Sequence, residues 1–289
     1  MRYILYFILI PALLPVFLIF KYIYGLDKVE REPMGFVLKV LLWGAVFSIP
    51  CAVVERFAIS FIQAFYDIES VKYAFMENTF GVALVEELSK WLVLMILVWR
   101  NNNFDYRYDG IVYAVFVGMG FAIFENIKYV LEYGMVTGIL RALTAIPGHC
   151  AFAIIMGTFY GSSKYFQSIK NKKMQVLCML YAIIIPIVGH GLYDFALTIS
   201  NNVLSVVVSI FYMIILDIFS LVLLLYQSKH DQFIVGSARP RQVNPQAPQN
   251  QLQPTQMNSG YINPNDYGNY VNPTNVVPNM YDPNDFQRR

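Results

Sequence analysis

Charged residues are scarce in this chain: Asp, Glu, Lys and Arg make up 14% of its 289 residues, whereas soluble domains carry about 25%. Hydrophobic residues make up 57%, and the mean hydropathy is +0.47. This composition excludes an ordinary soluble domain. The formal net charge is only +2 and no basic groove is visible, so nucleic acid is not an expected partner. The composition indicates a polytopic membrane protein surrounded by a lipid bilayer.

Cysteine is also scarce, and several familiar motifs are missing. Cys51, Cys150 and Cys178 all lie in apolar segments without a CxxC spacing, which argues against a disulfide framework or a zinc knuckle. No HExxH motif is present. No small-residue cleavage site follows the first apolar segment, so we expect a retained helix rather than a removed signal peptide.

Long apolar runs dominate the first 227 residues. Segments of about 20 largely apolar residues, each long enough to cross a bilayer as a helix, recur along this part of the chain. The predicted fold class is therefore all-α: a polytopic transmembrane helical bundle of about seven helices. The predicted spans are residues 3–24, 36–60, 78–99, 110–131, 139–165, 176–198 and 203–226.

The composition changes after residue 227. Residues 228–289 are rich in Asn, Pro and Gln and cannot bury enough apolar surface to offset the entropy lost on ordering. We therefore predict two parts, a transmembrane domain over 1–227 and a disordered tail over 228–289.

Lys and Arg residues indicate the orientation. More of them lie at one set of predicted helix ends, including Lys170, Lys172 and Lys173, than at the other. The richer side is expected to face the cytoplasm. Seven spans then place the tail inside the cell, with the chain in the plasma membrane.

The third predicted span contains three charged residues, Glu86, Glu87 and Lys90. Each costs roughly 2.5 to 3.5 kcal/mol at the centre of a bilayer unless it is paired or reaches water. Lys90 lies three and four residues from the two carboxylates, so it can reach either on a helix. One lysine cannot neutralise both, and the excess carboxylate suits acid–base chemistry.

Polar residues also stand in the next three predicted spans. Counting residues from the outer ends at 1.5 Å each places Glu86, Glu125, His149 and His190 about 9 to 15 Å deep, in one layer. Ionisable residues inside a membrane are functional candidates by default. The further polar residues are Glu125 and Asn126 in the fourth span, Arg141 and His149 in the fifth, and His190 and Asp194 in the sixth.

At these residues the sequence resembles the PrsW-type glutamic intramembrane proteases, part of a larger group with the CAAX prenyl proteases and bacteriocin-immunity membrane proteins. The resemblance covers about residues 77–198. Prenyl proteases of this group typically have a histidine and an arginine where this chain has Glu125 and Lys90, which favours the PrsW branch. The matching stretches, in order, are "EELSK" to an EExxK motif, "FAIFEN" to FxxxE, "RALTAIPGH" to an Arg-to-His motif and "HGLYD" to HxxxD/N.

The resemblance implies an intramembrane endopeptidase without a cofactor. Peptide hydrolysis needs a base that activates water and donors that hold the oxyanion. We assign Glu86 as the base, with His149 and His190 as hydrogen-bond partners of the water or oxyanion. Glu87 would hold Lys90. The remaining assignments are supporting: Glu125 would orient a histidine, Asp194 would hold His190, and Asn126 and Arg141 belong to the matched motifs. Spacing does not decide whether Glu86 or Glu87 is the base.

Two other functions fit the same residues. Glu86, Glu125, His149 and His190 could ligate zinc in a metal-dependent protease. The same carboxylates and histidines could form the relay of a proton-coupled transporter, although no inverted repeat is obvious. By analogy with PrsW-type proteins, the expected partner is a single-pass membrane protein such as an anti-sigma factor. The sequence carries no signal for an oligomeric state.

Overall fold

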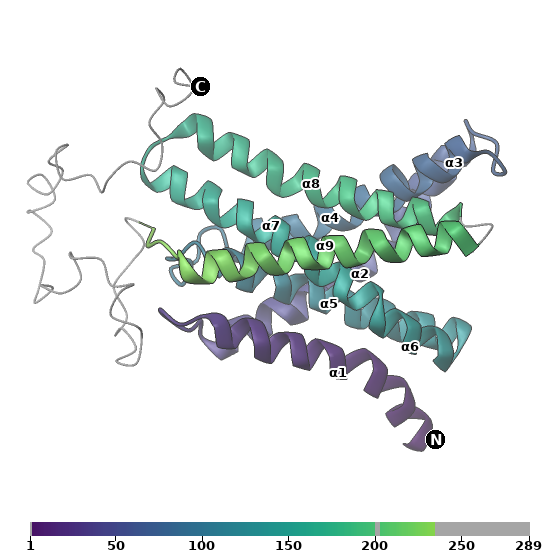
Figure 1. The fold of residues 1–289 in the computed structure, drawn as a ribbon, viewed down its shortest axis with the longest axis horizontal. Helices are drawn as coiled ribbons and strands as arrows, with labels where there is room; N and C mark the ends of the chain where they lie inside the picture. Colours follow the sequence, from purple (N-terminus) through teal and green to yellow (C-terminus); the bar gives the residue numbers. More distant parts are fainter. Residues whose placement is uncertain (1, 200–202, 235–289) are drawn as a thin grey trace, which may run out of the picture. The chain divides into compact units, whose positions relative to one another are not determined.

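The computed structural model describes residues 2–199 and 203–234, and the side chains of residues 13–199 and 206–234. These residues are helical apart from connecting segments and one isolated β-bridge between Tyr106 and Phe233. Figure 1 shows the helices, which are α1 (Arg2–Leu26), α2 (Met34–Gln63), α3 (Val71–Met76), the π-helix η1 (Glu77–Ala83), α4 (Leu84–Leu97), α5 (Asp109–Tyr133), α6 (Met135–Leu143), α7 (Ala145–Ser168), α8 (Lys172–Thr198) and α9 (Val203–Lys229).

The predicted all-α fold is confirmed for the described residues. α3, η1 and α4 follow one another without a gap, and α6 meets α7 at Thr144, so the ten helices form seven consecutive helical segments. Five helical stretches are long and apolar enough to cross a membrane: α2, α5, the α6–α7 run, α8 and the described part of α9. The third segment begins at Val71, earlier than the predicted residue 78, because its charged residues shortened the apolar run in the sequence.

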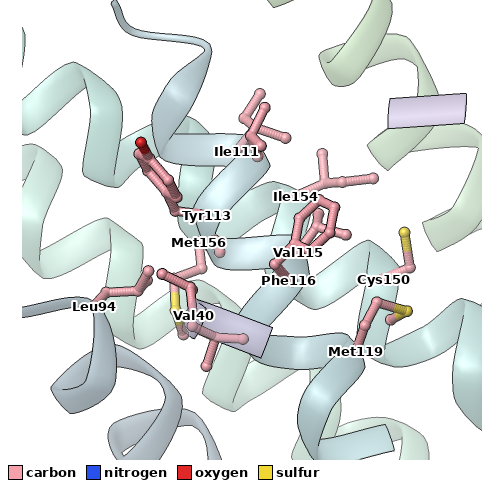
Figure 2. Packing of buried hydrophobic residues seen from close by; sticks show 14 of the residues in the cluster. Val40, Leu94, Ile111, Tyr113, Val115, Phe116, Met119, Cys150, Ile154 and Met156 are labelled. Carbon is pink, nitrogen blue, oxygen red and sulfur yellow. The ribbon is translucent and has the colours of Figure 1, made fainter. Parts of the chain in front are cut away.

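α5 and α7 lie at the centre of the bundle. α5 packs against α1, α2, α4 and α7, while α7 also packs against α8 and α9. Glycines bring α5 and α7 together, since a Cβ added at Gly157 would lie 2.5 Å from the carbonyl oxygen of Gly110. Close approach through small residues is a common way for membrane helices to associate. Figure 2 shows part of the buried core, in which side chains of α5 and α7 lie in one cluster with Val40 of α2 and Leu94 of α4.

The outer faces of the bundle carry large apolar side chains. Phe57 and Phe61 of α2 are 73% and 67% exposed, Phe65 in the turn after α2 is 68% exposed, and Ile215 of α9 is 64% exposed. A soluble protein rarely exposes contiguous apolar surface of this extent, whereas hydrocarbon solvates it. Together with the apolar helix lengths, these faces identify a multi-pass membrane protein.

The helical unit continues beyond the predicted boundary at residue 227. α9 ends at Lys229, and the next residues pack back on the segment before α5. The backbone N–H of Arg107 donates to the carbonyl of Gln232 at 3.0 Å, and that of Ile234 donates to the carbonyl of Asp105 at 2.7 Å. The first part of the predicted tail therefore belongs to the helical unit, and the rest, from residue 235, lies outside the described residues.

Candidate active site

A cavity of about 500 Å³ opens between α2, α5, α7 and α8, and the polar residues singled out from the sequence gather around it. Three of them lie behind its wall: Glu87, Lys90 and Asn126, which are buried. The other six line the cavity directly, namely Glu86, Glu125, Arg141, His149, His190 and Asp194. Helices distant in sequence thus bring all nine to one place.

Lys90 lies at the centre of the group. Its Nζ donates to Glu87 Oε1 at 2.7 Å and to Glu86 Oε2 at 3.0 Å, and it lies 3.1 Å from His149 Nδ1. The ammonium also stands 5.3 Å from the centroid of the Phe121 ring, within the range of a cation–π contact. A single ammonium therefore bridges both glutamates of α4 to a histidine of α7.

The π-helix η1 immediately precedes the two glutamates. The backbone N–H of Leu84 donates to the carbonyl of Thr79, five residues earlier, so the chain makes a wider turn before α4 begins. Stretches of π-helix are frequent at functional sites. α8 approaches this turn closely, because a Cβ added at Gly191 would lie 2.9 Å from Cα of Thr79. This approach places His190 beside Glu87.

The contacts of His149 fix its tautomer. Nδ1 faces the Lys90 ammonium, which has hydrogens to donate and cannot accept one. Nδ1 must therefore be the unprotonated, accepting nitrogen. Nε2 carries the hydrogen and donates it to Glu125 Oε2 at 3.1 Å, so this imidazole is neutral.

His190 has a different environment. Its Nδ1 lies 2.9 Å from Glu87 Oε1 and its Nε2 lies 3.2 Å from Asp194 Oδ2. Both carboxylates are satisfied together only when both ring nitrogens carry hydrogens. The Phe152 ring stacks on the imidazole with centroids 4.9 Å apart. The geometry therefore favours the imidazolium at His190, next to the neutral His149, whose ring centroid is 5.8 Å away.

Glu125 is held by α6 as well as by His149. Arg141 Nη2 donates to Glu125 Oε2 at 2.9 Å, and its guanidinium stacks on Tyr129, 3.8 Å from the ring centroid. Asn126, the next residue of α5, lies away from the cavity and donates from Nδ2 to the carbonyl of Gly138 at 3.3 Å. Asn126 thus fastens α6 to α5, which keeps Arg141 over Glu125.

The structure distinguishes the two adjacent glutamates, which spacing alone could not do. Glu87 is fully buried at 0% exposure, and one of its carboxylate oxygens already receives Lys90 and His190. Glu86 lines the cavity, and only its Oε2 accepts from Lys90. Of the two, only Glu86 can reach a water or a substrate in the cavity.

Sequence reasoning missed an ionisable residue of the cavity, Glu55 of α2. It lines the cavity and its Oε1 accepts a hydrogen bond from Cys51 Sγ at 3.2 Å. Arg56, Lys128 and Tyr129 also line the cavity and were not singled out. The signal was present at Glu55, because "CAVVERF" sets a glutamate inside a long apolar helix, where an ionisable residue is a functional candidate.

Two groups of side chains have the donors of a metal site. Ligand atoms of Glu86, Glu125 and His149 lie within 4.8 Å of one another, and so do those of Glu86, Glu87 and His190. These donor types suit zinc. Lys90 Nζ, however, already binds Glu86 and Glu87 and sets His149 Nε2 as the protonated nitrogen, whereas a metal ligand must be unprotonated. Zinc does not fit the groups unless Lys90 moves.

Comparison with known proteins places this sequence in a family. Residues 32–223 match the family described as PrsW family intramembrane metalloprotease. The chain is 34% identical over 190 residues to Protease PrsW of Oceanobacillus iheyensis, covering 66% of this chain and 82% of the relative. It is 32% identical over 196 residues to Protease PrsW of Bacillus subtilis, and 35% identical over 210 residues to that of Clostridioides difficile. These matches cover 68% and 71% of this chain, and 84% of each relative. No solved structure matches the chain.

Proposed function

Because this chain belongs to the PrsW family of intramembrane proteases, we propose that it hydrolyses a peptide bond of a membrane-anchored protein with a water activated by Glu86. One observation carries the assignment: Glu86 is the glutamate of the adjacent pair that lines the cavity, together with Glu125, His149 and His190. Lys90 holds one oxygen of its carboxylate. The other oxygen is available to accept a hydrogen bond from water.

The proposed reaction moves one proton through Glu86. The carboxylate takes a proton from the water as the water oxygen attacks the substrate carbonyl carbon, which gives a tetrahedral intermediate with a negative oxygen. Glu86 then returns the proton to the amide nitrogen as the carbon–nitrogen bond breaks. The products are a carboxyl terminus and an amine.

Cationic and hydrogen-bonding groups are placed to stabilise the oxyanion. Arg141 and the His190 imidazolium line the same cavity, where fixed positive charge stabilises the negative charge that develops in the transition state. The hydrogen on His149 Nε2 is donated to Glu125 in the free enzyme, and a substrate oxygen can replace Glu125 as its acceptor. Glu87 and Asp194 hold His190 in position.

We propose that no cofactor is needed. The rival is a zinc-dependent reaction, which the name of the matching family favours and which would require Lys90 to leave Glu86 and Glu87. Glu86, Glu125 and His149 would then hold the metal, and zinc would polarise the substrate carbonyl and acidify water. The contact between Lys90 and His149 Nδ1 supports the metal-independent reaction.

We further propose a single-pass membrane protein, such as an anti-sigma factor, as the substrate, by analogy with PrsW-type proteins. The excess of Lys and Arg at one set of helix ends supports a plasma-membrane location with residues 235–289 in the cytoplasm. The four matched motifs support a place for the family within the CAAX protease group.

The decisive experiment compares Glu86→Gln with Glu87→Gln. Glutamine keeps the shape and hydrogen bonds of glutamate but cannot accept the proton from water. Quantitative proteomics of membrane fractions should find a single-pass protein that accumulates intact with Glu86→Gln and is cleaved with the wild type. Glu86→Gln should be recovered in normal amounts, while Glu87→Gln should lower thermal stability because it weakens a fully buried ion pair.

Purified protein tests the metal dependence. Stoichiometric zinc together with activity that a chelator removes and zinc restores would transfer the assignment to the metalloprotease.

Full activity of Glu86→Gln would reject the assignment of Glu86 as the base. Glu69→Gln, an exposed position between α2 and α3, is the matched control and should change neither cleavage nor recovery.

A further inference from the structure

A second group of buried carboxylates lies at the end of the bundle where α1 and α9 end and α5 begins. Asp27 follows α1, Glu32 lies in the segment leading to α2, Asp105 precedes α5, and Asp109 is the first residue of α5. The four are 2%, 1%, 1% and 1% exposed, and we call them the acidic cluster. Asp109 lies near enough to interact electrostatically with the other three and with Asp231.

The acidic cluster is far from the cavity. Both include residues of α5, but at separate positions along this helix. Asp109 and Glu125 are sixteen residues apart on α5, which corresponds to about 24 Å at 1.5 Å per residue. None of the four carboxylates lines the cavity. The cluster therefore needs an explanation separate from peptide hydrolysis.

Three of the carboxylates converge closely enough to share an ion. Ligand oxygens of Glu32, Asp105 and Asp109 lie within 4.8 Å of one another. Asp109 Oδ2 accepts backbone hydrogen bonds from Asp105 and Tyr106 at 3.0 and 2.6 Å. These bonds wrap the segment before α5 around the carboxylate and hold its position.

Buried oxygens without a hydrogen bond provide a second, independent observation. Among the residues that the structure describes, none donates a hydrogen bond to Asp109 Oδ1 or Asp27 Oδ2, both of which are buried. A buried ionised carboxylate without compensation is strongly unfavourable. The guanidinium of Arg107 does not serve them, since it donates to Gln232 Oε1 at 2.6 Å and to Ser162 Oγ at 2.8 Å.

We propose that the acidic cluster binds a divalent cation that prefers oxygen ligands, with Glu32, Asp105 and Asp109 as ligands and Asp27 beside them. Hard cations such as Ca²⁺ and Mg²⁺ take carboxylate oxygens, and no nitrogen or sulfur donor stands among these ligands. The cation joins the segment between α1 and α2 to the start of α5, and so stabilises the bundle without taking part in the chemistry.

The test is thermal unfolding of the purified full-length protein in detergent, first treated with EDTA and then titrated with Ca²⁺ or Mg²⁺. At a cation concentration of 100 times the dissociation constant, the wild type should gain about 5 to 10 °C in Tm. Asp109→Asn should lose this gain, and Glu69→Gln, the matched exposed control, should keep it. If Asp109→Asn does not fold, Asp105→Asn is the substitute, with the same expected loss.

The cation is located by a third variant. Glu86→Gln alters the cavity and should keep the full cation-dependent gain in Tm. Loss of the gain in Glu86→Gln together with its retention in Asp109→Asn would place the cation in the cavity and overturn the proposal. So would an unchanged Tm of the wild type with both cations.

Discussion

Lys90 Nζ lies 3.1 Å from Nδ1 of His149, and this contact joins the α4 charges to the central helix α7. The contact determines the tautomer of His149 as well as its position. Since the ammonium can only donate, it leaves the hydrogen of His149 on Nε2, which faces Glu125. Lys90 thus acts as a positioning residue for His149 while it compensates the charges of Glu86 and Glu87.

Lys90→Met should impair both stability and turnover. Methionine has a similar length but no charge, so Glu86 and Glu87 would remain buried without their ammonium, at a cost of about 3 to 5 kcal/mol. We expect kcat to fall at least about 100-fold in the fraction that folds. Thermal unfolding and cleavage assays measure the two effects. Lys72→Met, at an exposed position of α3, is the control. Normal turnover in Lys90→Met would show that His149 needs no fixed tautomer.

His149→Ala and His190→Ala should each lower kcat by about two orders of magnitude or more, as removal of a single oxyanion donor does in other enzymes. Their effects should be less than additive in the double variant, because both rings serve one cavity. A double-mutant cycle on cleavage rates measures the coupling. Small and independent effects would instead identify two histidines that only fill the core.

Composition and the length of the apolar segments predict much of this fold, but they do not show which role each residue of the site has. Hydropathy locates helices because a span must be apolar over about 20 residues. It could not show the π-helix at Glu77–Ala83, because hydropathy does not distinguish a π-helical turn from an α-helical one. It could not separate Glu86 from Glu87 either, since their difference depends on which side chain meets α8. Glu55 was missed because it belongs to no matched motif, although its position inside the apolar helix α2 follows the same rule that identified Glu125.

Gly157→Ala should destabilise the protein by about 1 to 3 kcal/mol, as overpacked cores do. The added Cβ would lie 2.5 Å from backbone atoms of Gly110 and Ile111, so α5 and α7 must separate. Because these helices carry Glu125 and His149, activity should fall as well. Gly35→Ala is the matched control, with nothing within 4 Å of the added Cβ. Equal Tm values for the two variants would contradict the close packing of α5 on α7.

Truncation after residue 234 should leave cleavage intact, whereas truncation after residue 228 should lower Tm and activity. The shorter form loses Asp231, whose Oδ1 accepts from the backbone N–H of Tyr108 at 2.9 Å, and Ile234, which is 2% exposed. Both contacts support the segment that leads into α5. Cleavage of a purified substrate by the two forms makes the comparison. Loss of activity in the longer form would assign a role to residues 235–289.

Cysteine labelling should place the cavity in the outer half of the membrane. Glu125 lies eight residues before the end of α5 at Tyr133, about 12 Å along the helix, and the charge distribution predicts that this end faces outwards.

Cys51, Cys150 and Cys178 are buried, so an engineered thiol at an exposed position should dominate the labelling signal. In intact cells an impermeant thiol reagent should label Glu132→Cys and spare Asn102→Cys, and both should react after lysis. The scissile bond would then lie near the outer face. The opposite labelling would place the same residues in the cytoplasmic leaflet, and the expected substrate would be cut from the inside.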